Sequence, residues 1–142
     1  DGTNDADEKA ILNEIGNWMR INGEAIYGTR PWKVFGEGAH QAKAGSFAGQ
    51  KSTGELGARD TRFTRNKKGD VVYAIVLGWP EGDFAIQSFG SAAATQPGAV
   101  RHVEMLGSPA KLDWQQSATA LTVKKPEVAP SAIASALKIS LG

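Results

Sequence analysis

One amphipathic helix stands at the start of a chain that is otherwise patterned as strands, and this contrast constrains the fold most. Over residues 4–22 the apolar positions recur at the spacing of one helical face, with polar side chains on the remaining faces. The apolar stripe consists of Ile11, Leu12, Ile15, Trp18 and Met19. A lone amphipathic helix must bury such a stripe, so we expect it to pack against partners that this chain does not contain.

After Asp60 the apolar period changes to two, which indicates strands. In the segment 71–79, Tyr73, Ile75 and Leu77 fall on one face. Strands are predicted over residues 60–66, 71–79, 84–89, 100–106, 112–116, 119–124 and 134–141. Several short strands at near-regular spacing are typical of an antiparallel β-sandwich. The predicted fold is therefore mainly β: an antiparallel β-sandwich preceded by one amphipathic α-helix.

A polar stretch rich in Gly, Ala, Ser and Gln, residues 28–57, separates the helix from these strands. Loops of this length without regular structure are uncommon inside compact domains. Four apolar side chains within the stretch need somewhere to pack, and they are Trp32, Val34, Phe35 and Phe47. We therefore expect an extended connector that is wrapped on a surface rather than a free linker.

Composition excludes several classes of function. The 142 residues carry 16 basic and 15 acidic side chains, for a net charge of +1, and the densest basic group fits a strand end and hairpin turn, so no nucleic-acid partner is expected. That basic group is Arg62, Arg65, Lys67 and Lys68. No run of about 18 apolar residues is present, which argues against a membrane span. The absence of cysteine excludes disulfides and thiolate metal sites and leaves the compartment open.

The stretch Asn13–Trp32, NEIGNWMRINGEAIYGTRPW, resembles a junction in glycoside hydrolase family 29, the α-L-fucosidases. There, the last helix of a catalytic barrel leads into a C-terminal β-sandwich. Further matches follow in the family's order along nearly the whole chain: Asp60–Thr64, Val72–Ile75, Trp79–Pro80, Val103–Trp114, Leu121–Val123 and Ala136–Ile139. The block Asn22–Trp32 is the most specific part of this resemblance.

The resemblance implies three parts. Residues 1–27 would be the last helix of a (β/α)₈-like barrel and its junction, residues 28–57 the connector, and residues 58–142 the C-terminal β-sandwich. Such enzymes hydrolyse terminal α-L-fucose with retention, using an aspartate nucleophile and an acid/base carboxylate. Both groups lie upstream of the matched part, so we expect no catalytic residue, no activity of this segment alone and no cofactor. The implied partners are the upstream barrel and, for the parent enzyme, a fucosylated glycan.

Four charged residues are candidates for a site, and the strand and turn pattern favours a structural role for most of them. Glu24 is expected in the turn after the helix, where it would help to cap the next segment. Glu37 lies between two glycines, which fits either a turn or backbone pressed against a ligand. Asp60 and Arg62 share a strand face, so a local ion pair is expected.

Histidines and serines give no catalytic or metal-binding pattern. His40 and His102 lie far apart without metal-ligand spacing, so no metal site is expected. His40 is expected to be solvated, and His102, next to Val103 in a strand, to point outward. Ser46 and Ser52 lack the sequence context of an activated nucleophile.

The four tryptophans are the candidates for sugar contact, although packing is the first expectation for each. Trp18 belongs to the helix stripe and is expected to be buried. Trp32 is expected to pack on the barrel or the sandwich, and Trp114 to sit mid-strand in the core. Trp79 precedes Pro80 at a strand end, where sandwich domains often bind ligands, and is the candidate substrate-binding residue.

Two functions remain open from the sequence. In the first, the segment supports the barrel by burying one of its flanks and holding its final helix. In the alternative, the sandwich is a carbohydrate-binding module that targets fucosylated glycans.

The loop-like residues that lead straight into a helix suggest a chain that begins inside a longer protein. The lack of an Asn-x-Ser/Thr sequon agrees with a bacterial source, and the expected location is that of a periplasmic or secreted bacterial enzyme.

Overall fold

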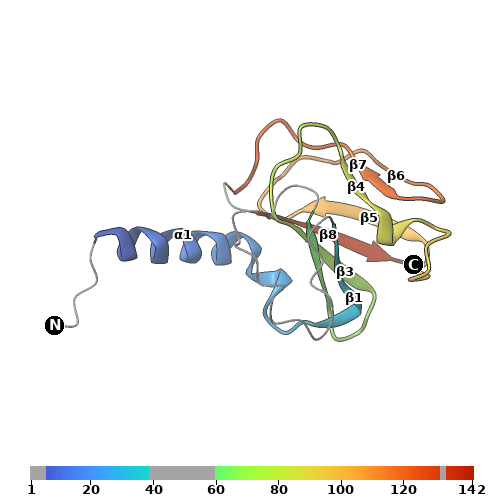
Figure 1. Cartoon of the computed structure of the whole chain (residues 1–142), viewed down its shortest axis with the longest axis horizontal. Helices are drawn as coiled ribbons and strands as arrows, with labels where there is room; N and C mark the ends of the chain where they lie inside the picture. The colour runs from blue at the N-terminus through green and yellow to red at the C-terminus, as the bar shows by residue number, and fades with distance from the viewer. Residues whose placement is uncertain (1–5, 39–59, 132–133) are drawn as a thin grey trace.

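A computed structural model describes residues 6–38, 60–131 and 134–142. Within these ranges the chain forms one α-helix followed by eight strands (Figure 1). Helix α1 (Ala6–Asn22) leads into the 3₁₀ turn η1 (Gly23–Ala25), and a second 3₁₀ turn, η4 (Gln87–Phe89), follows the fourth strand. The strands are β1 (Arg30–Glu37), β2 (Thr61–Arg65), β3 (Val71–Val76), β4 (Phe84–Ile86), β5 (Val100–Met105), β6 (Trp114–Gln116), β7 (Leu121–Val123) and β8 (Ser135–Leu141).

The strands form two antiparallel sheets, as the alternating pattern predicts. The larger sheet has the order β1-β2-β3-β8-β5, and the smaller one has the order β4-β7-β6. The last strand of the chain, β8, lies between β3 and β5, with Val71 opposite Ser140 and Val76 opposite Ser135. The prediction of a mainly β, antiparallel sandwich preceded by one helix is confirmed.

The main core lies on one face of the larger sheet and is apolar. Strand β3 contributes Val72, Ala74 and Val76 to it, and β8 contributes Leu137 and Ile139. At its edge the Trp32 ring stacks on Phe89, with centroids 4.7 Å apart and planes 8° from parallel, and meets the edge of Phe63 at 5.0 Å. Trp32 therefore packs within the sandwich, which is one of the two predicted environments.

A second cluster lies on the opposite face of the same sheet. Tyr73 and Ile75 of β3 are buried there beside Ala25 of η1, with Leu77 partly buried against them, so the predicted face of Tyr73, Ile75 and Leu77 is confirmed. Trp18 of α1 is also partly buried in this cluster. Strand β3 is thus covered on both faces, and the base of α1 helps to cover the outer one.

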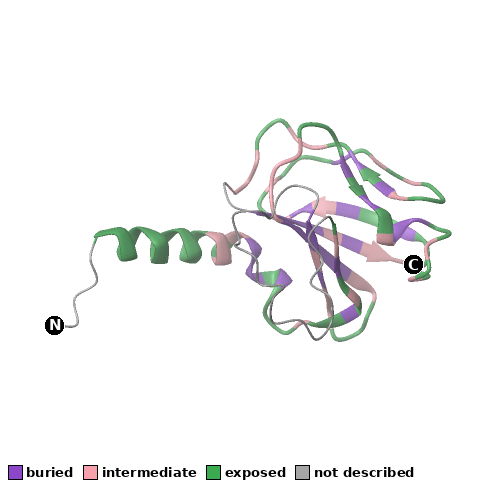
Figure 2. Ribbon diagram, in the orientation of Figure 1, coloured by how far each residue is buried: buried purple, intermediate pink, exposed green. Residues whose placement is uncertain are grey.

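Helix α1 extends away from the two sheets, and burial along it changes from one end to the other (Figures 1 and 2). Residues 6–17 are exposed, whereas Trp18, Met19 and Ile21 are half-buried and Asn22 is buried. The helix predicted over residues 4–22 is observed from Ala6 to Asn22; residues 4 and 5 lie outside the described ranges.

One part of the predicted connector is a strand. Residues 30–37 form β1, which pairs with β2 at the edge of the larger sheet, so this part is not a wrapped connector. Trp32 and Val34 alternate inward toward the core, while Pro31 and Gly36 interrupt the apolar pattern that would have marked a strand. Residues 39–57 lie outside the described ranges, and the domain boundaries stay a prediction.

Candidate functional site

In the described part of the chain, residues 6–17 of helix α1 present an exposed apolar surface. Three large aliphatic side chains lie exposed there: Ile11 at 56%, Leu12 at 55% and Ile15 at 52%. We call these three residues the exposed stripe. They continue the line of Trp18, which reaches the sandwich and donates a hydrogen bond from Nε1 to the Ala134 carbonyl at 3.1 Å. Trp18 is half-buried, so this chain covers only part of a ring that the sequence predicts to be buried.

Polar contacts fix the turn that follows α1 onto the outer face of the sheet. The Glu24 carboxylate accepts a hydrogen bond from the Tyr73 hydroxyl at 2.7 Å and pairs with the Lys138 ammonium at 2.6 Å. We call Glu24, Tyr73 and Lys138 the junction clamp. Thr64 adds a hydrogen bond to the Ala25 carbonyl at 2.6 Å, so β2, β3 and β8 all hold the turn. Glu24 lies in the predicted turn, but it bridges to the sheet.

The contacts within the junction clamp favour the charged forms of Glu24 and Lys138. The hydrogen bond from Lys138 lowers the pKa of Glu24, and the one from Tyr73 lowers it further, while burial acts in the opposite direction. The same bond to Glu24 raises the pKa of Lys138. Burial, followed by the bond to Glu24, raises the pKa of the Tyr73 phenol. Glu24 and Lys138 are therefore both charged across the neutral range.

Close packing secures the base of α1 from a second side. Gly107, in a turn with φ of +83°, lies so close to Ile21 that an added Cβ would overlap the Ile21 methyl group. Asn22 is fully buried and donates from Nδ2 to the Trp18 carbonyl at 3.3 Å. The direction in which α1 leaves the sandwich is thus set by apolar contacts on one side and by the junction clamp on the other.

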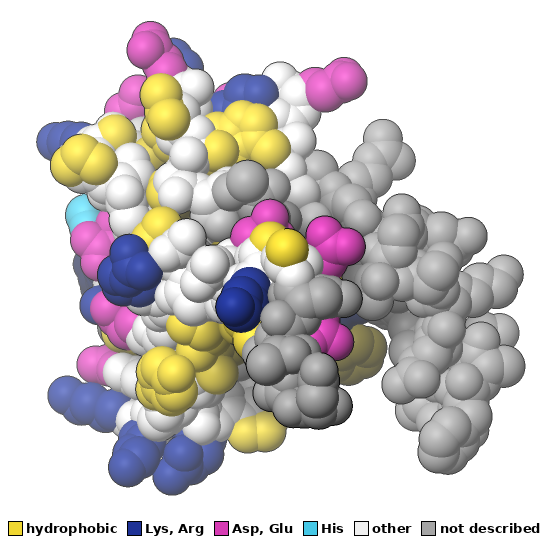
Figure 3. Space-filling view, turned by 90° about the vertical axis from the view of Figure 1, so that its left-hand side faces the viewer, with side chains coloured by type: hydrophobic (Ala, Val, Ile, Leu, Met, Phe, Trp, Pro, Cys, Tyr) yellow, Lys and Arg dark blue, Asp and Glu magenta, His cyan; other side chains and the backbone are white. Residues whose placement is uncertain are grey.

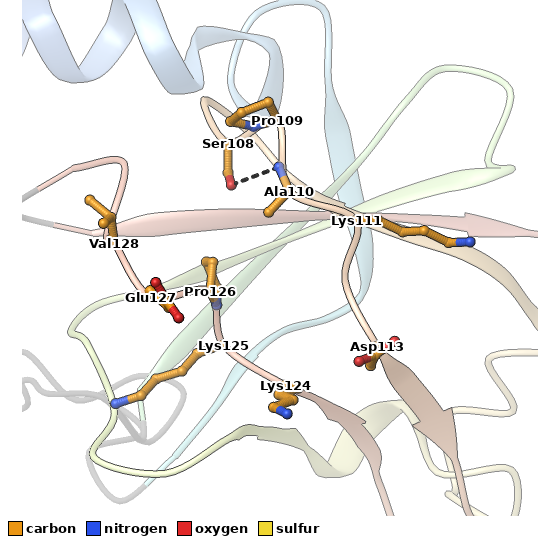
Figure 4. A pocket seen from close by; sticks show the side chains of 10 residues that line it. All are labelled: Ser108, Pro109, Ala110, Lys111, Asp113, Lys124, Lys125, Pro126, Glu127 and Val128. Atoms are coloured by element: carbon orange, nitrogen blue, oxygen red, sulfur yellow. Dashed lines mark hydrogen bonds between the residues drawn. The ribbon is translucent and has the colours of Figure 1, made fainter.

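A shallow groove of about 460 Å³ lies beside the base of α1 (Figure 4). Its walls are the loop after β5 and the loop after β7, and it is lined by Ser108, Pro109, Ala110, Lys111, Asp113, Lys124, Lys125, Pro126, Glu127 and Val128. Charges of both signs face it, and Lys125 already donates to the Pro80 and Glu81 carbonyls at 2.6 and 2.8 Å. Two carboxylates line the groove: Asp113 belongs to the loop after β5 and Glu127 to the loop after β7.

Trp79, the candidate for sugar contact, is half-buried beside this region. The Lys125 ammonium lies 5.9 Å from the centre of its ring, and Phe84 meets it edge-on at 5.6 Å. Both neighbours restrict the area that a sugar could stack on. Trp114 is also half-buried and packs against the main core, but it is the first residue of β6 and does not lie mid-strand as predicted.

The remaining candidate carboxylate, Glu37, has a local structural role. Its two oxygens accept hydrogen bonds from the backbone N–H groups of Gln87 and Ser88, each at 2.9 Å, where η4 begins. Glu37 is itself the last residue of β1 and not part of a turn, and its carboxylate holds the distant turn η4, whereas a ligand beside its flanking glycines stays a prediction. Its partner could not be found from the local pattern, because η4 lies about fifty residues downstream.

Of the other predicted residues, Asp60 is buried, Arg62 and His102 reach the surface, and the rest lie outside the described ranges. Arg62 lies over the Phe35 ring at 5.4 Å, and its ion pair with Asp60 stays a prediction. His102 points outward, as predicted, and lies 3.8 Å from Glu104. His40, Ser46 and Ser52 lie outside the described ranges.

Metal-binding clusters and membrane-spanning helices are both absent from the described part of the chain. In residues 6–38, 60–131 and 134–142, no three His, Asp or Glu side chains gather in a way that could hold a metal ion. Within the same ranges, no helix has both the length and the apolar character that crossing a membrane takes.

Comparison with known proteins connects this arrangement to one family. The family model described as the alpha-L-fucosidase C-terminal domain matches residues 55–140. An alpha-L-fucosidase of Branchiostoma floridae is 34% identical over 81% of this chain and 20% of its own length. The tissue alpha-L-fucosidase of Bos taurus is 34% identical over 86% of this chain and 21% of its own length. The chain thus spans about a fifth of the length of these curated relatives.

A solved structure shows the same fold at lower identity. The alpha-L-fucosynthase of Thermotoga maritima superimposes with a TM-score of 0.65 and 22% identity, over 98% of this chain and 27% of that one. The match includes the helix as well as the sheets, since it covers nearly all of the chain.

Proposed function

The chain belongs to glycoside hydrolase family 29, the α-L-fucosidases, of which it contains the C-terminal domain, and we propose that it is the non-catalytic support domain of such an enzyme. The parent enzyme would remove terminal α-L-fucose from glycans. In this proposal α1 is the last helix of an upstream (β/α)₈-like barrel, and the sandwich holds that helix in place.

The exposed stripe of α1 is the observation that carries the proposal. Ile11, Leu12 and Ile15 together expose apolar surface that soluble proteins normally bury. This chain spans only about a fifth of the curated relatives, so they contain a large additional part that could cover such a stripe. A barrel helix packs one face against its neighbours, which is the environment that the exposed stripe requires.

The support would be mechanical. The sandwich fixes the base of α1 through the junction clamp, the bond from Trp18 and the contact of Ile21 with Gly107. A helix anchored at one end has less freedom to leave its place in the barrel's outer ring. Active sites of such barrels lie at the opposite end from where this helix terminates, so the effect on the reaction would be indirect.

The direct test is to express the upstream domain through Gly23 with and without residues 24–142. We expect the truncated form to unfold at lower temperature and to lose α-L-fucosidase activity on heating before the longer form does. Equal thermal stability and equal activity of the two forms would contradict the support role.

Catalysis by the segment alone has a separate test. Purified residues 1–142 should release no product from an aryl α-L-fucoside, because the nucleophile and the acid/base carboxylate of such enzymes are expected upstream of this segment. Any turnover that survives a further purification step would overturn the non-catalytic assignment.

The alternative function is a carbohydrate-binding module, with Trp79 as its contact residue. Its support is that Trp79 is only half-buried and lies near the groove-lining Lys125. Titration of residues 1–142 with fucose and with fucosylated oligosaccharides, followed by calorimetry and tryptophan fluorescence, separates the two functions. Saturable binding that Trp79→Ala abolishes would favour the module over the support domain.

A further inference from the structure

The exposed apolar surface does not end with helix α1. Directly after η1, Tyr27 is 71% exposed and Ile26 is 41% exposed. We call these two residues the junction patch. The face from which α1 projects carries several apolar patches among charged side chains (Figure 3). Neither residue belongs to the buried apolar clusters of the sandwich.

Contacts at the base of the helix connect the junction patch to the exposed stripe. The Tyr27 ring lies against Gly23, where an added Cβ would come within 3.0 Å of the ring, and the Met19 methyl group lies 3.9 Å from the same point. Met19 follows Ile15 by one turn of the helix, so these two side chains lie on the same side of α1. Met19 thus lies one helical turn from Ile15 of the exposed stripe, and both Met19 and Tyr27 lie beside Gly23.

The junction patch is also held in a defined conformation. Ile26 and Tyr27 both donate backbone hydrogen bonds to the Gly23 carbonyl, at 2.9 and 2.8 Å, and the Thr29 hydroxyl donates to the Ile26 carbonyl at 2.7 Å. Gly28, with φ of +66°, then turns the chain toward β1. Because the junction clamp fixes the preceding turn on the sheet, Tyr27 is presented by an ordered turn and not by a loose loop.

We propose that the junction patch is the second half of the surface that docks on the upstream catalytic domain, with Tyr27 as its aromatic anchor. The inference rests on the proposed function, since it takes the upstream domain as the partner. A single partner that covers the exposed stripe would meet Met19 and Tyr27 next, because Met19 lies one helical turn from Ile15 and beside the same glycine as Tyr27. Tyrosine is frequent among residues that dominate protein interfaces, since it offers a large ring and loses few rotational degrees of freedom.

The test compares substitutions in two contexts: residues 1–142 alone, and the longer polypeptide that includes the upstream domain. In residues 1–142, Tyr27→Ala should shift the Tm by less than about 1 °C, because an exposed ring contributes little to stability. In the longer polypeptide, the same substitution should lower the Tm by about 2–4 °C, since an anchor lost at an interface costs well above the surface average.

Two control variants show whether the loss is specific to the ring. Tyr27→Phe keeps the ring and should retain most of the Tm of the longer polypeptide. Val128→Ala removes another exposed apolar side chain, 76% exposed on the rim of the groove, and should leave the Tm unchanged in both contexts. An effect of Val128→Ala as large as that of Tyr27→Ala would show that the loss is not specific to the junction patch and would overturn the inference.

The outcomes for this inference and for the support role can be told apart. If substitutions in the exposed stripe destabilise the longer polypeptide while Tyr27→Ala does not, the helix docks but the junction patch does not, and only this inference fails. If neither the substitutions in the exposed stripe nor Tyr27→Ala destabilise the longer polypeptide, the upstream domain does not contact this face. In that case the support role fails as well as this inference. If Tyr27→Ala lowers the Tm equally in both contexts, the ring stabilises the sandwich itself and the inference is wrong.

Discussion

The two halves of helix α1 have the same amphipathic pattern but different surroundings. At the base, Trp18 bonds to Ala134, Ile21 packs against Gly107, and Asn22 is buried. One turn further out, Ile15 is 52% exposed, and the turns beyond it have no more cover. The amphipathic pattern thus predicts that one face of the whole helix is buried. The structure shows that only the half at the base packs against the described part of this chain.

The contacts at the base of α1 include more hydrogen bonds and ion pairs than the apolar pattern of the helix predicts. The junction clamp, the Trp18 bond and the Thr64 bond place several polar contacts around one turn of chain. Such bonds depend on direction, so they orient the helix in a way that apolar packing alone does not. Substitutions made separately in the two halves should therefore have different effects.

The largest difference between the two halves of α1 is expected for alanine substitutions along its apolar face, one at Trp18 in the base and one at Ile15 in the exposed stripe. Trp18→Ala removes a half-buried ring and its hydrogen bond, and should lower the unfolding free energy of residues 1–142 by about 2 kcal/mol. Ile15→Ala should change it by less than about 0.5 kcal/mol. Urea denaturation of the two variants measures both values, and equal losses would contradict the division of the helix.

A pair of glycines offers the next largest contrast. Gly107→Ala should destabilise the chain by about 1–2 kcal/mol, because its φ of +83° disfavours other residues and the new Cβ would strike Ile21. Gly16→Ala, in the free half of α1, meets nothing within 4 Å and should stabilise the helix by about 0.5–1 kcal/mol. Thermal unfolding of both variants should give Tm shifts of opposite sign, and shifts of the same sign would show that the halves do not differ in this way.

Acid titration of the junction clamp should give the smallest effect. The pKa of Glu24 is lowered in the folded state, so its contribution is complete above the glutamate's unfolded pKa and is lost as pH falls through the lowered value. The Glu24 side chain is 46% exposed, so solvent screening limits this contribution to about 0.5 kcal/mol.

The corresponding measurement is the Tm of the native chain and of Glu24→Gln between about pH 3 and pH 8, a range that spans the titration of a glutamate. The difference between the two should be largest near neutrality and should shrink on acidification. The raised pKa of Lys138 adds a second limit, because its contribution is present below the unfolded lysine's pKa and is lost as pH rises through the raised value. A Tm difference that grows toward low pH would contradict the assigned role of Glu24.

Local periodicity is enough to predict the helix and most of the sandwich strands. The helix at Ala6–Asn22 and the buried face of Tyr73 and Ile75 follow from spacing that neighbouring residues set. Strand β1 escapes such a prediction because Pro31 and Gly36 interrupt its pattern, and its strand character depends on pairing with β2 across a long connection.

The candidate site is harder to predict, because its contacts join distant parts of the chain. Glu24 meets Tyr73 and Lys138 only after β3 and β8 pair in the middle of the sheet. The carboxylate of Glu37 is explained only by the position of η4. The exposed stripe is the exception, since a helical pattern without a helical partner in the sequence already indicates missing cover.

Docking of helix α1 on an upstream domain is measured most directly by the effect of Ile15→Gln on thermal unfolding in two contexts. Glutamine keeps a good helical preference and a similar size while removing the apolar surface. We expect almost no change of Tm in residues 1–142 alone and a loss of several degrees in the longer polypeptide with the upstream domain. An unchanged Tm in the longer polypeptide would contradict the claim that helix α1 docks its exposed stripe on that domain.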